Sequence, residues 1–167
     1  MKVNIKKMTV LALSVTLAMI LSFVESQIPP LSTVPGVKLG LANIVAVVLL
    51  YLYGWREACA VSLIRILLTA LLFGNAFALI YSLSGGALSL LIMIFAKRFL
   101  PFGKVGVSVL GALMHNVGQI LAAIVVMRTL AISLYLIPLV VTGTVSGVLV
   151  GILAAVISAR VDLSLKK

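Results

Sequence analysis

Few residues in this chain could do chemistry, because 63% of its 167 residues are hydrophobic and only 10% are charged. The clearest candidate is Arg65, which interrupts the apolar stretch EACAVSLIRILLTALLFG. An arginine at the centre of a membrane helix costs about 2.5 to 3.5 kcal/mol on insertion scales, so it must face protein, water or a ligand. Its planar guanidinium suits a carboxylate or a phosphate. The structural alternative is that Arg65 bonds neighbouring carbonyls or extends its charge toward the inner membrane face.

A second polar group lies in the stretch GALMHNVGQILAA, which contains His115, Asn116 and Gln119. Residues three or four apart share one face of a helix, so these side chains form a single polar stripe. At about 1.5 Å of rise per residue, His115 and Arg65 come to similar depths in the membrane, and we expect them to line one cavity. The alternative is that the two amides only bond neighbouring helices, for about 0.6 kcal/mol each.

The remaining candidate side chains argue against metal binding and independent catalysis. His115 is the only histidine, Cys59 is the only cysteine, and the three acids, Glu25, Glu57 and Asp162, are far apart in sequence. Prenyl diphosphate condensation normally needs clustered aspartates that hold Mg²⁺ through oxygen ligands. The chain also lacks the glycine-rich loop ending in Lys-Ser/Thr that binds ATP phosphates. We therefore predict no metal site, no cofactor and no catalytic residue.

The elements that must position these residues are membrane helices, since the mean hydropathy is +1.35. A helix needs about 20 apolar residues to cross a bilayer, and the apolar runs lack the alternating pattern of membrane strands. The sequence predicts an all-α bundle of six transmembrane helices in a single domain, residues 1–167. The predicted spans are 8–27, 39–53, 57–73, 76–96, 105–127 and 132–159. The second is short for a full crossing, so we expect it to begin inside the preceding loop. The first span ends without a small-x-small cleavage site, so we expect it to remain as a helix.

The net charge of +10 is explained by the orientation of these helices. With a cytoplasmic N-terminus, ten basic residues lie on the inner side: Lys2, Lys6, Lys7, Arg56, Lys97, Arg98, Lys104, Arg160, Lys166 and Lys167. Two lie on the outer side: Lys38 and Arg128. This asymmetry follows the positive-inside rule and predicts that both termini are cytoplasmic. No nucleic-acid partner is expected, because the charges form no stripe with stacking aromatics.

The stretch ESQIPPLSTVPGVKLGLAN predicts a structured loop at the outer face, between the first two spans. Non-helical backbone at membrane depth is tolerated where it is buried by protein or lines a cavity, so this loop is a natural lid. Its turn-forming residues are Pro29, Pro30, Pro35 and Gly36. Glu25, Lys38 and Asn43 flank the predicted cavity. Glu25 and Lys38 could equally pair across the loop.

Small residues mark where helices approach closely. In the first span the pairs are Ser14 with Ala18, or Ala12 with Thr16. In the last span Gly143, Gly147 and Gly151 repeat every four residues, and packing within the chain's own bundle is the favoured interpretation. The SLSGG stretch of the fourth span either bends that helix or allows a neighbour close.

Three runs, ESQIPPLSTVPGVKLGLANIV, LIRILL and GALMHNVGQ, resemble a bacterial membrane family known both as Gx transporters and as heptaprenyl diphosphate synthase component I. The likeness covers nearly the whole chain. That family is similar in turn to the S-components of energy-coupling-factor transporters, small six-helix proteins that capture vitamins. The resemblance implies an outward-facing pocket under the first loop, in the bacterial cytoplasmic membrane. It also implies that Ser14 and Ala18 dock on a transmembrane coupling subunit, which works with ATPases.

Two functions are consistent with these features. The first is a substrate-binding subunit for uptake of a small polar or anionic solute, energised by a partner. The second is a non-catalytic membrane component of polyprenyl diphosphate or quinone synthesis. The predicted substrate-binding residues are Arg65, His115, Asn116, Gln119, Asn43, Glu25 and Lys38.

Overall fold

The computed structural model describes residues 5–27 and 40–165, and within these ranges the chain is helical without a β-strand. Six α-helices and one short 3₁₀ helix follow one another in the described part of the chain. They are α1 (Ile5–Gln27), α2 (Leu41–Leu52), α3 (Trp55–Phe73), α4 (Ala76–Phe99), α5 (Lys104–Met127), η1 (Leu130–Tyr135) and α6 (Leu136–Leu165). The predicted all-α class is confirmed.

Four of the described segments are long and apolar enough to cross a membrane, namely α1, α4, α5 and the continuous stretch of η1 and α6. This indicates a multi-pass membrane protein. The predicted count of six spans is not confirmed. Helix α2 has 12 residues, about 18 Å at 1.5 Å per residue, which is too short for a crossing of about 30 Å. Helix α3 is long enough but carries three charged residues, Arg56, Glu57 and Arg65.

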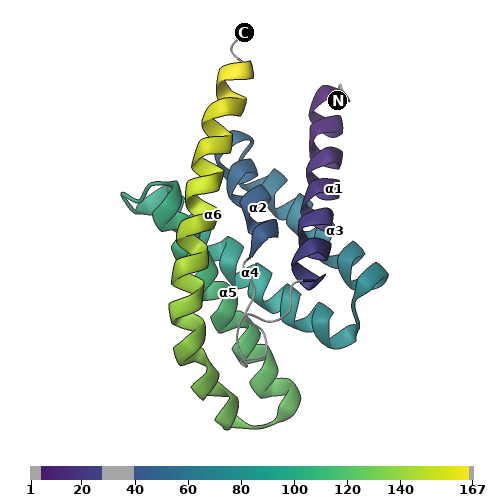
Figure 1. Ribbon diagram of the computed structural model, residues 1–167, viewed down its shortest axis with the longest axis vertical. Helices are drawn as coiled ribbons and strands as arrows, with labels where there is room; N and C mark the ends of the chain where they lie inside the picture. Colours follow the sequence, from purple (N-terminus) through teal and green to yellow (C-terminus); the bar gives the residue numbers. More distant parts are fainter. Residues whose placement is uncertain (1–4, 28–39, 166–167) are drawn as a thin grey trace.

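The short helix α2 lies between α1 and α6 and forms the centre of the packing (Figure 1). Val47 and Leu50 of α2 are 0% and 1% exposed, and they belong to one apolar cluster with Met93 of α4 and Val107 of α5. The start of α1 and the end of α6 lie at the same end of the molecule, and the turn between α5 and η1 lies at the other. This arrangement is consistent with two termini on one side of the membrane.

Helices α4 and α5 are in backbone contact, because both carry glycine where they meet. A Cβ atom added to Gly118 would lie 2.6 Å from the Ser84 carbonyl oxygen and 2.8 Å from the Gly85 Cα. The Ser84 hydroxyl donates a 2.7 Å hydrogen bond to the Gly118 carbonyl across the same contact. Helix α4 is continuous through SLSGG, so these glycines allow close approach and do not interrupt the helix.

Helix α6 packs against α5 through its glycine ladder. A Cβ at Gly147 would lie 2.8 Å from the Val109 Cα, and one at Gly151 would lie 2.6 Å from the Val105 Cα. The ladder therefore serves the chain's own bundle, as predicted.

Two lysines tie helix ends together on the side where the chain begins and ends. Lys7 of α1 forms an ion pair with Glu57 in the first turn of α3. Lys97 of α4 donates a 2.6 Å hydrogen bond to the Leu50 carbonyl, near the end of α2. The last carbonyls of a helix lack partners within that helix, so Lys97 satisfies one of them.

The substitution Gly118→Ala should lower the melting temperature of the purified protein in detergent. The added methyl group meets α4 backbone that cannot move aside alone, and such overpacking costs about 1 to 3 kcal/mol, against about 1 kcal/mol gained in helix propensity. Gly103→Ala is the matched control, because nothing lies within 4 Å of its added Cβ. Equal melting temperatures for the two variants would contradict the close contact.

Cysteine labelling should place the two ends of the bundle on opposite membrane faces. In a Cys59→Ser background, a cysteine at Leu130, which is 76% exposed, should react with an impermeant maleimide from outside intact cells. A cysteine at Phe102, which is 48% exposed and lies between α4 and α5, should react only after the cells are opened. The reverse pattern would invert the topology predicted from the positive charges.

Candidate functional site

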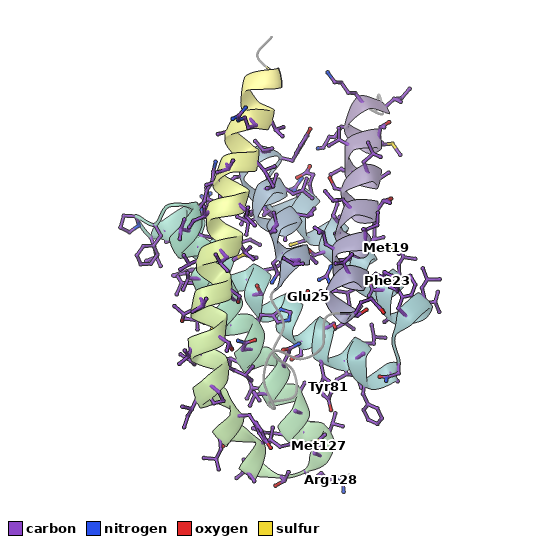
Figure 2. All side chains as sticks on the ribbon, viewed as in Figure 1. Met19, Phe23, Glu25, Tyr81, Met127 and Arg128 are labelled. Carbon is purple, nitrogen blue, oxygen red and sulfur yellow. The ribbon has the colours of Figure 1, made fainter. Side chains whose placement is uncertain are left out.

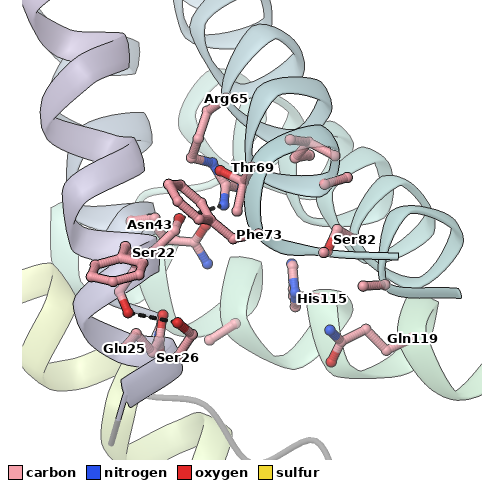
Figure 3. A pocket seen from close by; sticks show the side chains of 18 of the residues that line it. Ser22, Glu25, Ser26, Asn43, Arg65, Thr69, Phe73, Ser82, His115 and Gln119 are labelled. Atoms are coloured by element: carbon pink, nitrogen blue, oxygen red, sulfur yellow. Dashed lines mark hydrogen bonds between the residues drawn. The ribbon is translucent and has the colours of Figure 1, made fainter. Parts of the chain in front are cut away.

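A pocket of about 170 Å³ lies among α1, α2, α3, α4, α5 and α6, and it gathers most of the polar residues singled out from the sequence. Six of the seven predicted binding residues line it: Glu25, Asn43, Arg65, His115, Asn116 and Gln119. Figure 3 shows Arg65 on one side of the pocket and Ser82, His115 and Gln119 on another. Lys38 and the predicted lid residues Pro29, Pro30, Pro35 and Gly36 lie outside the described residues.

Arg65 reaches the pocket from the middle of α3 and is held there by α1. Its Nη1 atom donates a 3.1 Å hydrogen bond to the Ser22 hydroxyl. Glu25, one turn further along α1, lines the same pocket. A guanidinium has five N–H donors in a planar fork, and the bond to Ser22 uses one of them. The pocket therefore holds a cation whose donor capacity is not exhausted by that bond.

Glu25 also fixes the corner at which α2 begins. One of its carboxylate oxygens, Oε1, accepts a hydrogen bond from the Gly40 backbone N–H. Gly40 has a φ of 70°, a left-handed conformation that glycine adopts without the steric cost of a Cβ. The Asn43 N–H then donates to the Gly40 carbonyl at 2.9 Å, so the start of α2 and its Asn43 are set beside the end of α1.

His115 and Gln119 line the pocket because α5 lies against the glycines of α4. A Cβ at Gly85 would lie 2.8 Å from the His115 carbonyl oxygen and 3.0 Å from the Gln119 Cγ. Any larger residue at position 85 would push both side chains away from their present positions. Arg65 and His115, which the sequence placed at similar depths, both line this pocket.

Asn116 has a structural partner within the bundle. Its Nδ2 atom donates a 2.7 Å hydrogen bond to the Leu139 carbonyl of α6. Gly143 leaves room for the amide, since a Cβ there would lie 2.5 Å from Nδ2. The sequence left open whether the amides bond neighbouring helices or bind a ligand. For Asn116, the structure supports the bond between helices.

Several polar pocket residues were not singled out from the sequence. They include Ser22 and Ser26 on α1, Thr69 on α3 and Ser146 on α6. The usable signal was helical spacing: Thr69 follows Arg65 by four residues, and Ser22 precedes Ser26 by four. Such pairs share a helical face, so a search for polar residues one turn from Arg65 and Glu25 would have found Thr69 and Ser22.

The composition of this pocket suits binding better than catalysis. It offers a guanidinium, a carboxylate, an imidazole, amides and hydroxyls on an apolar frame, the usual pattern of a small-molecule site. In the part of the chain that the structure describes, no three His, Cys, Asp or Glu side chains gather to hold a metal ion. Cys59 is partly buried and does not line the pocket.

The two residues predicted to dock on a partner differ in their surroundings. Ala18 is 2% exposed and packs in the apolar cluster of the bundle. Ser14 is partly buried, and its hydroxyl donates to the Val10 carbonyl of its own helix at 2.8 Å. Ala12 and Thr16, the second small pair of α1, are exposed. A docking role for Ser14 and Ala18 stays a prediction.

Comparison with known proteins identifies a family. Residues 14–157 match the family described as heptaprenyl diphosphate synthase component I. The match covers most of the chain, which therefore belongs to this family. No curated protein sequence and no solved structure matches it.

The substitution Asn116→Ala should lower the melting temperature of the ligand-free protein more than Gln119→Ala does. It removes an observed interhelical hydrogen bond worth about 0.6 kcal/mol, and at most about 2 kcal/mol, and leaves space beside Gly143. Melting curves of both variants in one detergent would measure the difference. Equal curves would indicate that the bond to Leu139 contributes nothing measurable to stability.

Proposed function

We propose that this member of the heptaprenyl diphosphate synthase component I family is a membrane-embedded binding subunit for a small polar or anionic solute. The observation that carries the proposal is Arg65, a cation within an apolar helical bundle, facing a pocket that also presents Ser22, Glu25 and His115. An ionisable residue inside a membrane is by default a candidate functional site, because its insertion cost needs a compensating use. An anionic group would use the guanidinium donors that Ser22 does not occupy.

Transport by this subunit would depend on a partner. The sequence contains no glycine-rich ATP-binding loop, so the energy must come from elsewhere. A transmembrane coupling subunit with its ATPases, in a bacterial cytoplasmic membrane, is the arrangement that we propose. The exposed side of α1 that carries Ala12 and Thr16 supports this idea, since small residues permit close helix packing. If such a partner binds, Ala12 and Thr16 would contact it, and Ala18 would pack α1 against its own bundle.

The second candidate is a non-catalytic membrane component of polyprenyl diphosphate synthesis. The family description favours it directly. The described carboxylates do not favour a catalytic role, because they are far apart. Glu25 lines the pocket. Glu57 forms an ion pair with Lys7 in the first turn of α3, whereas the pocket lies along the later part of that helix, from Arg65 to Phe73. In this candidate the same pocket would hold an anionic intermediate for a catalytic partner.

Native mass spectrometry of the purified protein should reveal a co-purified small molecule, and Arg65→Ala should lose it. Removing a charge-assisted contact worth about 1.5 to 3 kcal/mol lowers affinity by roughly tenfold to a hundredfold. The matched control is Arg56→Ala, which deletes a charge at the exposed start of the same helix, over the Trp55 ring. The control should retain the molecule at the wild-type level.

Melting curves without ligand separate binding from structure. A binding Arg65 predicts that Arg65→Ala keeps the ligand-free melting temperature and loses only the ligand-induced increase. A purely structural Arg65 predicts lower stability whether or not ligand is present, because the Ser22 hydroxyl loses its hydrogen-bond donor. That second pattern, with retention of the co-purified molecule, would refute the proposed role of Arg65.

A further inference from the structure

A second cavity adjoins the polar pocket. It has a volume of about 510 Å³ and lies among α4, α5, η1 and α6. Ala78, Ser82 and Gln119 line both cavities, so the two spaces are neighbours at these residues. We call the second space the apolar groove. Its other lining residues are Tyr81, Ile120, Ala123, Met127, Ile132, Tyr135 and Leu139.

The two spaces differ in chemistry. The polar pocket carries the charged side chains Arg65 and Glu25, whereas no charged side chain is among the described residues that line the groove. The sticks of Figure 2 place Glu25, Tyr81 and Met127 in this order toward the end of the molecule at which α5 terminates. The groove therefore leads away from the charged pocket toward that end.

Size also argues that the two spaces act together. Small-molecule sites typically measure about 300 to 1,000 Å³. The polar pocket, at about 170 Å³, falls below that range, and the groove, at about 510 Å³, falls within it. A solute held by the polar pocket alone would be very small, and one that used both spaces would need a polar end and an apolar end.

We infer that the ligand is a single-chain amphiphile whose anionic head lies at Arg65 and whose apolar chain passes Gln119 into the groove. This inference rests on the proposed function and narrows its solute to one class. Gln119 and Ser82 stand at the junction, where a head group gives way to its chain. The groove walls offer Ile120, Ala123 and Met127 to the chain, and burial of each methylene there favours binding.

The test uses the full chain in nanodiscs of zwitterionic phospholipid, with labelled n-alkyl phosphates from butyl to dodecyl and inorganic phosphate as probes. Ala123→Trp fills the groove from α5 without touching Arg65. Val125→Trp is the matched control, because Val125 lies on the same helix, is 76% exposed and does not line the groove. Comparing variants in identical nanodiscs cancels the partition of each probe into the bilayer.

In the wild type and in Val125→Trp, affinity expressed against the probe concentration free in water should rise by up to about fourfold per methylene until the groove is full. In Ala123→Trp this rise should flatten while binding of the shortest probe is retained. Arg65→Ala should weaken all chain lengths by a similar factor, roughly tenfold to a hundredfold. These three patterns together assign the head and the chain to separate spaces.

Parallel chain-length curves for Ala123→Trp and Val125→Trp would overturn the inference, because the chain would then lie outside the groove. Binding of short anions with no dependence on chain length would also overturn it and would leave the proposed binding function intact. Displacement of octyl phosphate by a two-chain anionic phospholipid at equal mole fraction would refute the single-chain assignment. If the wild-type protein bound none of the probes and carried no co-purified molecule, the proposed function itself would be refuted.

Discussion

A polar group at membrane depth needs a partner inside the bundle or in a ligand, because the surrounding hydrocarbon offers none. Helical hydrogen bonds satisfy most of the backbone, so the remaining polar contacts become specific ties between helices. Ser84 bonds the Gly118 carbonyl, Asn116 bonds the Leu139 carbonyl and Lys97 bonds the Leu50 carbonyl. The charged Arg65 keeps unused donor capacity, since Ser22 takes one of its five donors. That capacity faces the pocket.

Glycine contacts decide how closely the pocket walls approach. The backbones of α4 and α5 touch at Gly85 and Gly118, and α6 lies on α5 along Gly143, Gly147 and Gly151. Van der Waals packing of this kind drives helix association in membranes, where burial of apolar surface gives no advantage over lipid. Gly85 and Gly143 also contact pocket residues, because Gly85 meets His115 and Gln119, and Gly143 meets Asn116. Packing and site geometry therefore depend on the same positions.

Among the described residues, the pocket lining offers one guanidinium, one carboxylate and several hydroxyls, which can hold and orient an anion, but no clustered acids that would bind Mg²⁺ for diphosphate chemistry. Both proposed functions are consistent with this pocket. In each, the chain binds the molecule, and another subunit supplies the energy for transport or the catalytic residues. The neighbouring apolar groove adds a constraint that does not follow from either function alone, because it calls for an apolar part in the ligand. A molecule with an anionic end and an apolar chain would match the fall in polarity from Arg65 to Met127.

The sequence by itself determined the all-α class, the apolar helices and the residues most in need of a polar environment. These features are local, because hydropathy, helical period and the insertion cost of a charge can all be read from one segment. Only the tertiary structure decided that α2 is buried at the centre of the bundle, that SLSGG brings α5 close, and that Asn116 bonds α6. Ser22 and Thr69 joined the site for the same reason. A serine or threonine costs little in an apolar helix, so its role depends on what the neighbouring helix brings to its face, and that is set by packing between segments far apart in the chain.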